Sequence, residues 1–285
     1  MPANTRTSLW RRSAVVGTSL VLALSLAACG GDSDASSEEG SGGGSGLMED
    51  GVLTVGMNLQ FEPEMYLDEN NEPAGYDVDL LEQLADEMGV ELDIVNLDFD
   101  GLIPGLQSKK FDMVSVGLTA TDERKQVVDF SREYVPYVSV LAVPEDDEGP
   151  FTIENYDVEG NTITALQGSS GEQLAKDTFP NASVEGFGQQ NSALLEVATG
   201  RAQGAVLEDY ILAQYIEANE GELKVADLPE PLAIGYGSWA VQKGNTALVE
   251  QLDEFLCDAQ EGGDLAAAYS KNFGVDDFPT MPGGC

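Results

Sequence analysis

Apolar residues recur along the chain with two spacings, one typical of strands and one typical of helices. The elements predicted in the first half are strands at 52–57, 92–97 and 113–116 and helices at 79–88 and 103–107. The helix at 79–88 ends before Gly89, a common helix-terminating residue. Strands and helices that alternate in this order predict a parallel sheet covered by helices.

The same alternation starts again after an extended stretch from Tyr137 to Pro144. The second set of predicted elements comprises strands at 162–166, 184–187 and 205–207, and helices at 171–179, at 192–199 and from Asp209. Two similar βα units joined by one connection predict an α/β fold with two lobes.

The first 28 residues are predicted to be an export signal. Arg6, Arg11 and Arg12 precede an apolar run that is too short for a confident membrane span. The run ends in Leu26-Ala-Ala-Cys29, which looks like a bacterial lipobox, so Cys29 is expected to be lipidated and to become the N-terminus. The alternative is a free cysteine in an ordinary signal peptide.

Residues 29–46 are rich in glycine and serine and are predicted to be a flexible tether. Such a chain reaches about 20–25 Å. No second long apolar run follows, so contact with the membrane is expected through the lipid alone.

Charge narrows the range of partners. The chain has 13 Lys+Arg against 51 Asp+Glu, and a formal charge of −38. Removal of residues 1–28 takes away three arginines and no acid, which gives −41. Nucleic acid and anionic lipid are poor partners for such a surface. Because the acids are spread along the chain, adaptation to high salt is a hypothesis that we hold open.

Histidine is absent from the sequence, which removes the commonest general base and metal ligand. Cys257 and Cys285 do not form a metal-binding spacing. In an exported protein, a disulfide between them is expected, and two free thiols are the alternative. We expect no metal and no cofactor.

Arg124 is the most conspicuous candidate binding residue. It follows Gly117-Leu-Thr119 and the run Thr121-Asp-Glu, which is predicted to cap a helix with Arg124 in its first turn. Ligands collect where strands of an open sheet give way to helices, and a guanidinium suits capture of a carboxylate. The alternative is an exposed arginine paired with a nearby acid.

Several further motifs are each weak evidence for a family when taken alone, but their order and spacing together are strong evidence. They are Gly75-Tyr-Asp77-Val-Asp79-Leu, Phe99-Asp-Gly101-Leu-Ile-Pro104, Asp129-Phe-Ser131, Gly168-Ser-Ser-Gly171, Ala205-Val-Leu-Glu-Asp209 and Tyr236-Gly237. With the Arg124 run they make the chain resemble, from about Gly51 to Gly274, the family-3 extracellular solute-binding proteins of amino-acid ABC transporters.

The resemblance implies a type II periplasmic-binding-protein-like fold, with two Rossmann-like lobes joined by a two-strand hinge. Lobe 1 is expected at 47–138 and 235–285 and lobe 2 at 139–234, with the chain crossing back near residues 232–237. The ligand is expected in the cleft between the lobes.

By the same resemblance, Arg124 clamps the α-carboxylate of an amino acid, and Thr119 and the Gly117 backbone bind its carboxylate or ammonium group. Ser169 and Ser170 contribute from a helix N-terminus, where free N–H groups favour an anion. Asp209 matches the position that receives the α-ammonium. The alternatives are turn and cap roles for Thr119 and the serines, and a plain N-cap for Asp209.

In the pocket for the ligand's side chain, Phe61 and Phe99 are expected to flank the ligand with their rings, and Asn58 and Glu208 are expected to recognise its side chain. Either ring is otherwise an ordinary core residue. The chain departs from the family pattern at Glu64, where a large aromatic is usual after proline. Glu62, Glu64 and Glu208 favour a basic side chain, although acids are common throughout this chain.

The function expected from the resemblance is capture of an amino acid, basic or polar, and delivery to an ABC permease with its ATPase. The protein is expected to be a monomer, anchored by lipid on the extracytoplasmic side, and not an enzyme. A ligand-sensing lipoprotein is the first alternative. A dehydratase-like enzyme on the same fold is the second, although no nucleophile–base pair is visible in the sequence.

Overall fold

The computed structural model describes residues 46–279 and 281–285. The expected signal peptide, Cys29 and nearly all of the expected tether therefore lie outside the described residues. Within the described residues, no helix combines the length and the apolar character needed to cross a bilayer.

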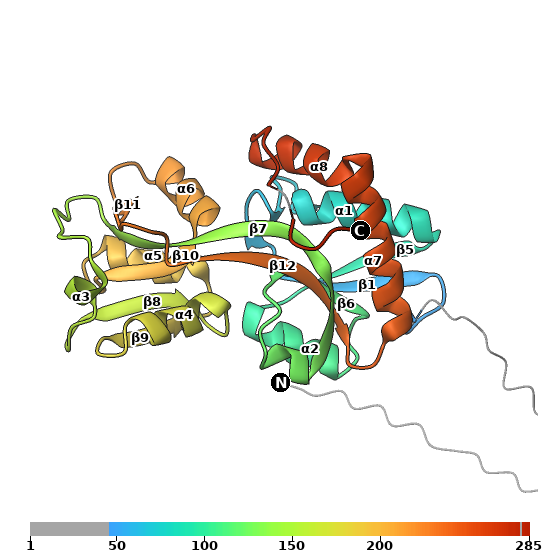
Figure 1. Cartoon of the computed structure of the whole chain (residues 1–285), viewed down its shortest axis with the longest axis horizontal. Helices are drawn as coiled ribbons and strands as arrows, with labels where there is room; N and C mark the ends of the chain where they lie inside the picture. Colours follow the sequence, from blue (N-terminus) through green and yellow to red (C-terminus); the bar gives the residue numbers. More distant parts are fainter. Residues whose placement is uncertain (1–45, 280) are drawn as a thin grey trace, which may run out of the picture. The chain divides into compact units, whose positions relative to one another are not determined.

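One sheet of nine strands runs through the described part of the chain in the order β5-β1-β6-β12-β7-β10-β8-β9, with β11 paired to β7. The first three strands in this order belong to the half that we call lobe 1, and β10, β8, β9 and β11 belong to lobe 2 (Figure 1). β7 and β12 extend through both halves. The parallel sheets predicted from the βα alternation are thus confirmed for each lobe, because β1 pairs in parallel with β5 and β6, and β8 with β9 and β10.

Lobe 1 is assembled from two parts of the chain. Its N-terminal elements are β1 (Val52–Met57), β2 (Gln60–Phe61), β3 (Met65–Leu67), β4 (Pro73–Ala74), α1 (Tyr76–Met88), β5 (Glu91–Asn96), η1 (Phe99–Gly101), α2 (Leu102–Gln107), β6 (Met113–Leu118) and η2 (Arg124–Gln126). Its C-terminal elements are α7 (Thr246–Gly262) and α8 (Asp264–Phe273). β6 is buried at every position, as expected of a strand covered on both faces.

Lobe 2 is continuous in sequence between the two long strands. Its elements are α3 (Ile153–Tyr156), β8 (Thr162–Leu166), α4 (Ser170–Thr178), β9 (Ser183–Phe187), α5 (Gln190–Ala198), β10 (Gly204–Glu208), α6 (Asp209–Ala218) and β11 (Leu223–Val225). β8 has the predicted bounds, and the other predicted strands and helices of this lobe lie within two residues of theirs.

The connection between the lobes is a pair of antiparallel strands, β7 (Val128–Pro144) and β12 (Ala233–Gln242). Their ladder runs from Val128 paired with Gln242 to Ser139 paired with Ala233, with register shifts around Ser238. This is the double crossing that the resemblance implies. The lobe boundaries expected at 138/139 and 234/235 fall inside these two strands, which continue without interruption.

The core of lobe 1 reaches the crossing strands through aromatic side chains. Trp239 on β12 is fully buried, and its ring centroid lies 5.0 Å from that of Tyr134 on β7 and 5.9 Å from that of Phe255 on α7. A smaller cluster around Phe179 and Leu141 lies within lobe 2. The larger cluster contains residues of both lobes, for instance Leu53 on β1 and Leu212 on α6, so buried apolar packing continues from lobe 1 through the crossing strands into lobe 2.

The prediction of a helix capped by the Thr121-Asp-Glu run, with Arg124 in its first turn, is wrong. The chain makes a single 3₁₀ turn, η2, and the strand β7 starts at Val128. The predicted capping contact is present in part, because the Thr121 hydroxyl accepts from the Arg124 N–H at 3.2 Å. The β-branched and aromatic residues from Val127 onward favour a strand and end the turn early.

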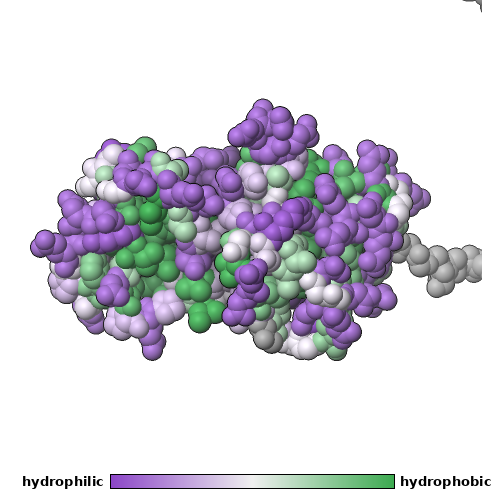
Figure 2. All heavy atoms as spheres, turned by 90° about the horizontal axis from the view of Figure 1, so that it is seen from above, coloured by the Kyte–Doolittle hydropathy of each residue, from purple (hydrophilic) through white to green (hydrophobic). Residues whose placement is uncertain are grey.

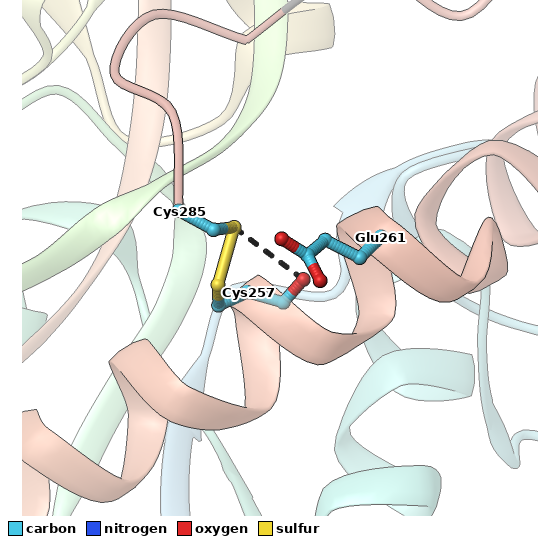
Figure 3. A group of neighbouring side chains, drawn as sticks. All are labelled: Cys257, Glu261 and Cys285. Carbon is cyan, nitrogen blue, oxygen red and sulfur yellow. Dashed lines mark hydrogen bonds between the residues drawn. A yellow bond between two sulfur atoms is a disulfide. The ribbon is translucent and has the colours of Figure 1, made fainter.

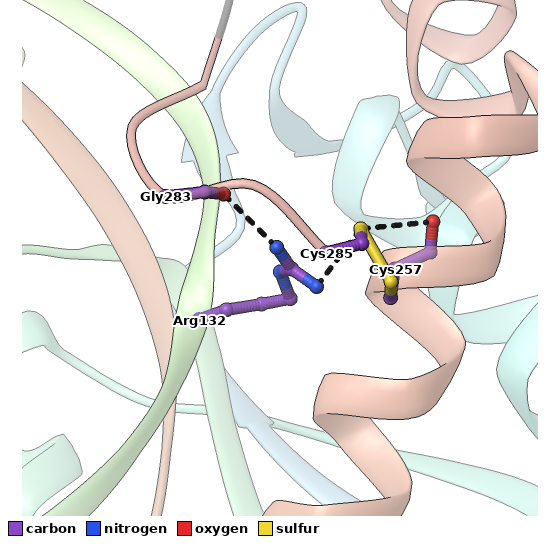
Figure 4. Close-up of a disulfide and its surroundings, with 4 residues drawn as sticks. All are labelled: Arg132, Cys257, Gly283 and Cys285. Atoms are coloured by element: carbon purple, nitrogen blue, oxygen red, sulfur yellow. Dashed lines mark hydrogen bonds between the residues drawn. A yellow bond between two sulfur atoms is a disulfide. The ribbon is translucent and has the colours of Figure 1, made fainter.

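The C-terminal tail is fastened to lobe 1 at its last residue. A disulfide joins Cys285 to Cys257 on α7 (Figure 4). Arg132 on β7 donates to the Gly283 carbonyl at 3.1 Å and to the Cys285 Sγ at 3.1 Å. Figure 2 shows hydrophilic residues over much of one face of the protein, which agrees with the excess of acid in the sequence.

Candidate functional site

A small cavity of about 30 Å³ lies where the two lobes meet. Residues from both lobes line it: Phe61, Glu64, Phe99, Val116, Gly117, Thr119, Arg124, Tyr137, Leu166, Ser169, Ser170, Glu208, Tyr210 and Ile211. Eight of the ten predicted ligand-binding residues are among them. The volume suffices for about two water molecules, so a ligand as large as an amino acid enters only if the lobes separate.

Arg124 forms the cationic end of this cavity and is 9% exposed. Its guanidinium donates to the Thr119 carbonyl in lobe 1 and to the Gly168 carbonyl in lobe 2, both at 2.9 Å. It also lies 5.8 Å from the centroid of the Phe99 ring, a cation–π distance. None of the salt bridges between described side chains includes Arg124.

Burial lowers the pKa of Arg124, although Tyr137, Glu123 and Glu208 oppose that shift. A guanidinium stays charged in a protein. The cavity therefore contains a desolvated positive charge whose direct partners are neutral carbonyls. Such a group favours a carboxylate, which can form two charge-assisted hydrogen bonds with it. The exposed, acid-paired arginine considered as the alternative does not describe this residue.

The hydroxyl groups near Arg124 include one that caps a helix. Ser169 is the N-cap of α4 and accepts from the Glu172 N–H at 3.0 Å. This is the capping role given above as the alternative to ligand binding. Ser170 lies 3.3 Å from Thr119, oxygen to oxygen, and this contact crosses between the lobes. The N-terminus of α4 thus faces the cationic end of the cavity.

Glu64 forms an acidic end of the same cavity, and its side chain is 1% exposed. Its Oε2 accepts a hydrogen bond from the Tyr210 hydroxyl in lobe 2. Its Oε1 is buried without a hydrogen-bond partner, as is the Tyr137 hydroxyl. Both oxygens lie beside Gly117, where φ is 53° and a Cβ would clash with each of them.

Asp77 on α1 adds a second buried carboxylate behind Glu64. Its Oδ2 accepts from the Ser115 hydroxyl at 2.6 Å and from the Tyr134 hydroxyl at 2.7 Å. Burial raises the pKa of Asp77 to about 7. Burial also raises the pKa of Glu64 well above its ordinary value, and the nearby Asp77 charge raises it further.

Glu208, the last residue of β10, is partly buried and lines the cavity between these two ends. Burial raises the pKa of Glu208, and the charge of Asp209 adds to the shift, while Arg124 opposes it. Glu208 is also among the charges that raise the pKa of Glu64. One carboxylate therefore acts on both ends of the cavity.

Two predicted site residues do not line the cavity. The Asn58 side chain donates to the Leu97 carbonyl at 2.7 Å and accepts from Gln60. Asp209 is exposed at the start of α6, where its side chain accepts from the Tyr210 N–H at 2.9 Å. In this arrangement of the lobes, Asn58 hydrogen-bonds within lobe 1. Asp209 is the first residue of α6 and not its N-cap, which is Glu208, so the N-cap alternative does not describe Asp209 either.

Tyr137, Tyr210, Val116, Leu166 and Ile211 line the cavity but were not predicted. Tyr137 follows Pro136 in a stretch that the sequence shows to be extended, and Tyr210 directly follows Glu208-Asp209. Their nearness to predicted site residues was a usable signal. Nothing in the alternation of polar and apolar residues distinguishes them from core tyrosines.

The rim of the cleft is joined by hydrogen bonds from lobe 2 amides to lobe 1. The Gln189 side chain donates to Asp98 and that of Gln167 donates to Asp100, both at 3.0 Å. The Gln190 N–H donates to the Gln60 side chain at 2.9 Å. These contacts hold the lobes together around the cavity.

Among the described residues, one group brings three potential metal ligands together. Atoms of Cys257, Glu261 and Cys285 lie within 4.8 Å of one another (Figure 3). Both sulfur atoms are in the disulfide, and thiolates rather than disulfide sulfurs are the usual ligands. This group therefore does not support a metal centre.

Residues 53–275 match the family described as bacterial extracellular solute-binding proteins, family 3. The arginine-binding extracellular protein ArtP of Bacillus subtilis is 28% identical over 254 residues, which are 88% of this chain and 94% of ArtP.

Solved structures share the fold. A P235GK mutant of ArgBP from T. maritima has a TM-score of 0.72 and 33% identity, covering 79% of this chain and 96% of that one. An ancestral arginine-binding protein bound to glutamine has a TM-score of 0.73 and 31% identity, covering 80% of this chain and 100% of that one. The type II periplasmic-binding architecture is thereby confirmed.

Proposed function

Because this chain belongs to the family-3 bacterial extracellular solute-binding proteins, we propose that it captures a free amino acid between its lobes and delivers it to an ABC permease with its ATPase. The observation that carries the proposal is the buried Arg124 guanidinium, which lines the interlobe cavity and has no carboxylate partner among the described residues. In a chain with 51 acidic residues, that arrangement reserves the charge for a ligand carboxylate.

A ligand carboxylate at Arg124 couples binding to closure. Arg124 already contacts both lobes, and Thr119 and Ser170 meet across the cleft beside it. A charge left unpaired in the closed cleft costs about 3–5 kcal/mol. A ligand that supplies both a carboxylate and an ammonium group stabilises the closed form, and the permease responds to that form.

The ligand's side chain is basic or polar in this proposal. Glu64 and Glu208 place carboxylates in the cavity, and the rings of Phe61 and Phe99 line it. The names of relatives support the same range, since ArtP is arginine-binding and the ancestral protein was solved with glutamine. The protein itself is a monomeric binding protein without catalysis.

Attachment to the membrane is through a lipid on Cys29, with residues 29–46 as the tether and the lobes on the extracytoplasmic side. The lipobox-like sequence before Cys29 supports this anchor. Cys29→Ser is expected to release the protein into the medium with ligand binding intact. Continued membrane association of that variant would refute the anchor, and fractionation with immunodetection measures the outcome.

The ligand is tested by thermal shift of the full chain, in high salt and detergent, against the twenty amino acids, ornithine, citrulline and ectoine. A ligand at a hundred times its dissociation constant adds about 2.7 kcal/mol to the free energy of unfolding, a shift of a few degrees. Hits among basic or amide amino acids support the proposal. A panel without any hit would contradict the amino-acid assignment.

A further inference from the structure

Resting on the proposed function, we propose that Glu64 selects a ligand with a cationic side chain and releases a proton to solvent as that ligand binds. Glu64 is a fully buried acid that lines the cavity between the lobes. The substrate class is therefore an amino acid with an ammonium or guanidinium group at the end of its side chain.

The argument starts from what surrounds the Glu64 carboxyl. It is buried on every side, and its Oε1 has no hydrogen-bond partner. The charged groups that act on it from neighbouring elements are Asp77 on α1 and Glu208 on β10. Both are acids. Arg124, the one cation lining the described cavity, forms no salt bridge with Glu64; its guanidinium donates to the Thr119 and Gly168 carbonyls and interacts electrostatically with Tyr137.

The remaining titratable neighbours are tyrosines, which are neutral at ordinary pH. Those that interact electrostatically with Glu64 are Tyr76, Tyr134, Tyr137, Tyr210 and Tyr269. Burial beside two other acids, without a salt-bridged cation, favours the neutral form of the Glu64 carboxyl, although the hydrogen bond from Tyr210 favours its carboxylate form. The raised pKa of Glu64 agrees with this geometry.

A cationic side chain reverses that balance. Placed against Glu64 Oε1 and the Tyr137 hydroxyl, an ammonium or guanidinium group supplies hydrogen-bond donors to two buried oxygens that otherwise have no partner. Its charge favours the carboxylate form. The O–H bond of the Glu64 carboxyl then breaks, the electron pair stays on the carboxylate, and the proton passes to solvent.

Closure of the lobes contributes to the same selection of a cationic side chain. The Tyr210 hydroxyl reaches Glu64 from α6 and hydrogen-bonds its Oε2, so Glu64 contacts lobe 2 on one oxygen and the cavity on the other. A neutral side chain of similar length, such as the ureido group of citrulline, can donate hydrogen bonds to Oε1 but has no charge to favour the carboxylate form. The site therefore discriminates between arginine and citrulline, which have nearly the same shape and different charge.

The test is isothermal titration calorimetry of the full chain with arginine and with citrulline. Each titration is run at pH 7 in buffers of different ionisation enthalpy, which gives the number of protons released. Net proton release is expected with arginine and none with citrulline. Glu64→Gln is expected to abolish the release and to reduce the arginine-over-citrulline affinity ratio at least about tenfold. Glu69→Gln, an exposed acid of the same lobe, is the matched control and is expected to change neither.

Tyr210→Phe separates this role from a merely structural one. The Tyr210 hydrogen bond lowers the pKa of Glu64, so its loss is expected to move the pH range of proton release upward. Binding of both ligands without proton release overturns the inference and leaves the proposed function standing. Release that persists in Glu64→Gln also overturns it and assigns the proton to Asp77 or Glu208, the other buried carboxyls near Glu64. Failure of both ligands, and of the whole amino-acid panel, overturns the proposed function as well.

Discussion

The two ends of the interlobe cavity achieve burial of charge in opposite ways. At one end, Arg124 keeps its charge and satisfies part of it with two backbone carbonyls. At the other end, burial and the charges of Asp77 and Glu208 favour the neutral form of Glu64, although the Tyr210 hydrogen bond opposes them. Arginine cannot give up its proton under ordinary conditions, whereas a carboxyl can gain one. The first end is therefore permanently charged, and the second becomes charged when a cation arrives.

Removal of the cationic end is expected to have the largest effect. Arg124→Ala should weaken amino-acid binding at least about a hundredfold, because each charge-assisted hydrogen bond to a carboxylate contributes about 1.5–3 kcal/mol. Calorimetry measures the affinity, and Lys125→Ala, an exposed neighbouring cation, is the control. Unchanged affinity in Arg124→Ala would mean that the carboxylate binds elsewhere.

Substitution of Asp77, the carboxylate behind Glu64, tests how the free energy of unfolding depends on pH. Its pKa of about 7 in the folded protein is above the ordinary value of 3.8, so the folded state holds a proton that the unfolded state lacks between about pH 4 and pH 7. This contribution to the free energy of unfolding is complete below about pH 4 and is lost as pH rises through about 7.

In Asp77→Asn, the fall in the free energy of unfolding between pH 5 and pH 8 is expected to be smaller by on the order of 2 kcal/mol, because an amide does not titrate. Denaturant unfolding at pH 5 and pH 8 measures it. Asp86→Asn, exposed on the same helix, is the control. A variant with the same decline as the unmodified chain would show that Asp77 is ionised throughout this range.

Substitution of Asp209 tests whether lobe 2 contributes the carboxylate that binds the ligand's ammonium group at the cationic end. Asp209→Asn is expected to cost less than Arg124→Ala, about tenfold or below, because hydrogen bonding survives while the charge is lost. Tighter binding would contradict the ammonium role. No change, together with a loss in Glu208→Gln, would assign that role to Glu208, which already lines the cavity.

The smallest effect is expected at the rim. Gln189→Ala removes one amide-to-carboxylate hydrogen bond between the lobes, at Asp98. The bond is exposed and is expected to contribute about 0.5–1.5 kcal/mol to closure. A drop in affinity of a few fold, equal for arginine and citrulline, is the expected calorimetric result. A change in their ratio would extend the selecting region to the rim.

The sequence predicted the elements better than the contacts. Strands at 52–57 and 162–166 have the predicted bounds because their apolar runs end at clear turn residues. The turn at Arg124 was mistaken for a helix because capping residues precede both kinds of turn. The resemblance supplied the double crossing, which pairs β6 with a strand more than a hundred residues away and which local alternation of residues cannot reveal.

For the site, residue types identified the charges but not their surroundings. Arg124 was conspicuous because cations are scarce in this chain. The buried position of Glu64 could not be read from a stretch that also contains the exposed Glu62. Tyr137 and Tyr210 come from different lobes, so their meeting beside Glu64 depends on how the lobes close.

The pairing of β7 with β12 also affects how the protein assembles. Lobe 2 is an insertion between the two strands, and its parallel pairings, β8 with β9 and β8 with β10, are all made within that insertion. Lobe 1 needs β12 beside β6, for instance Val241 paired with Met113, and the loop that this closes is among the longest in the fold. During synthesis from the N-terminus, every element of lobe 2 emerges before β12. Lobe 2 can therefore complete its own sheet first, and lobe 1 is completed by the last quarter of the chain.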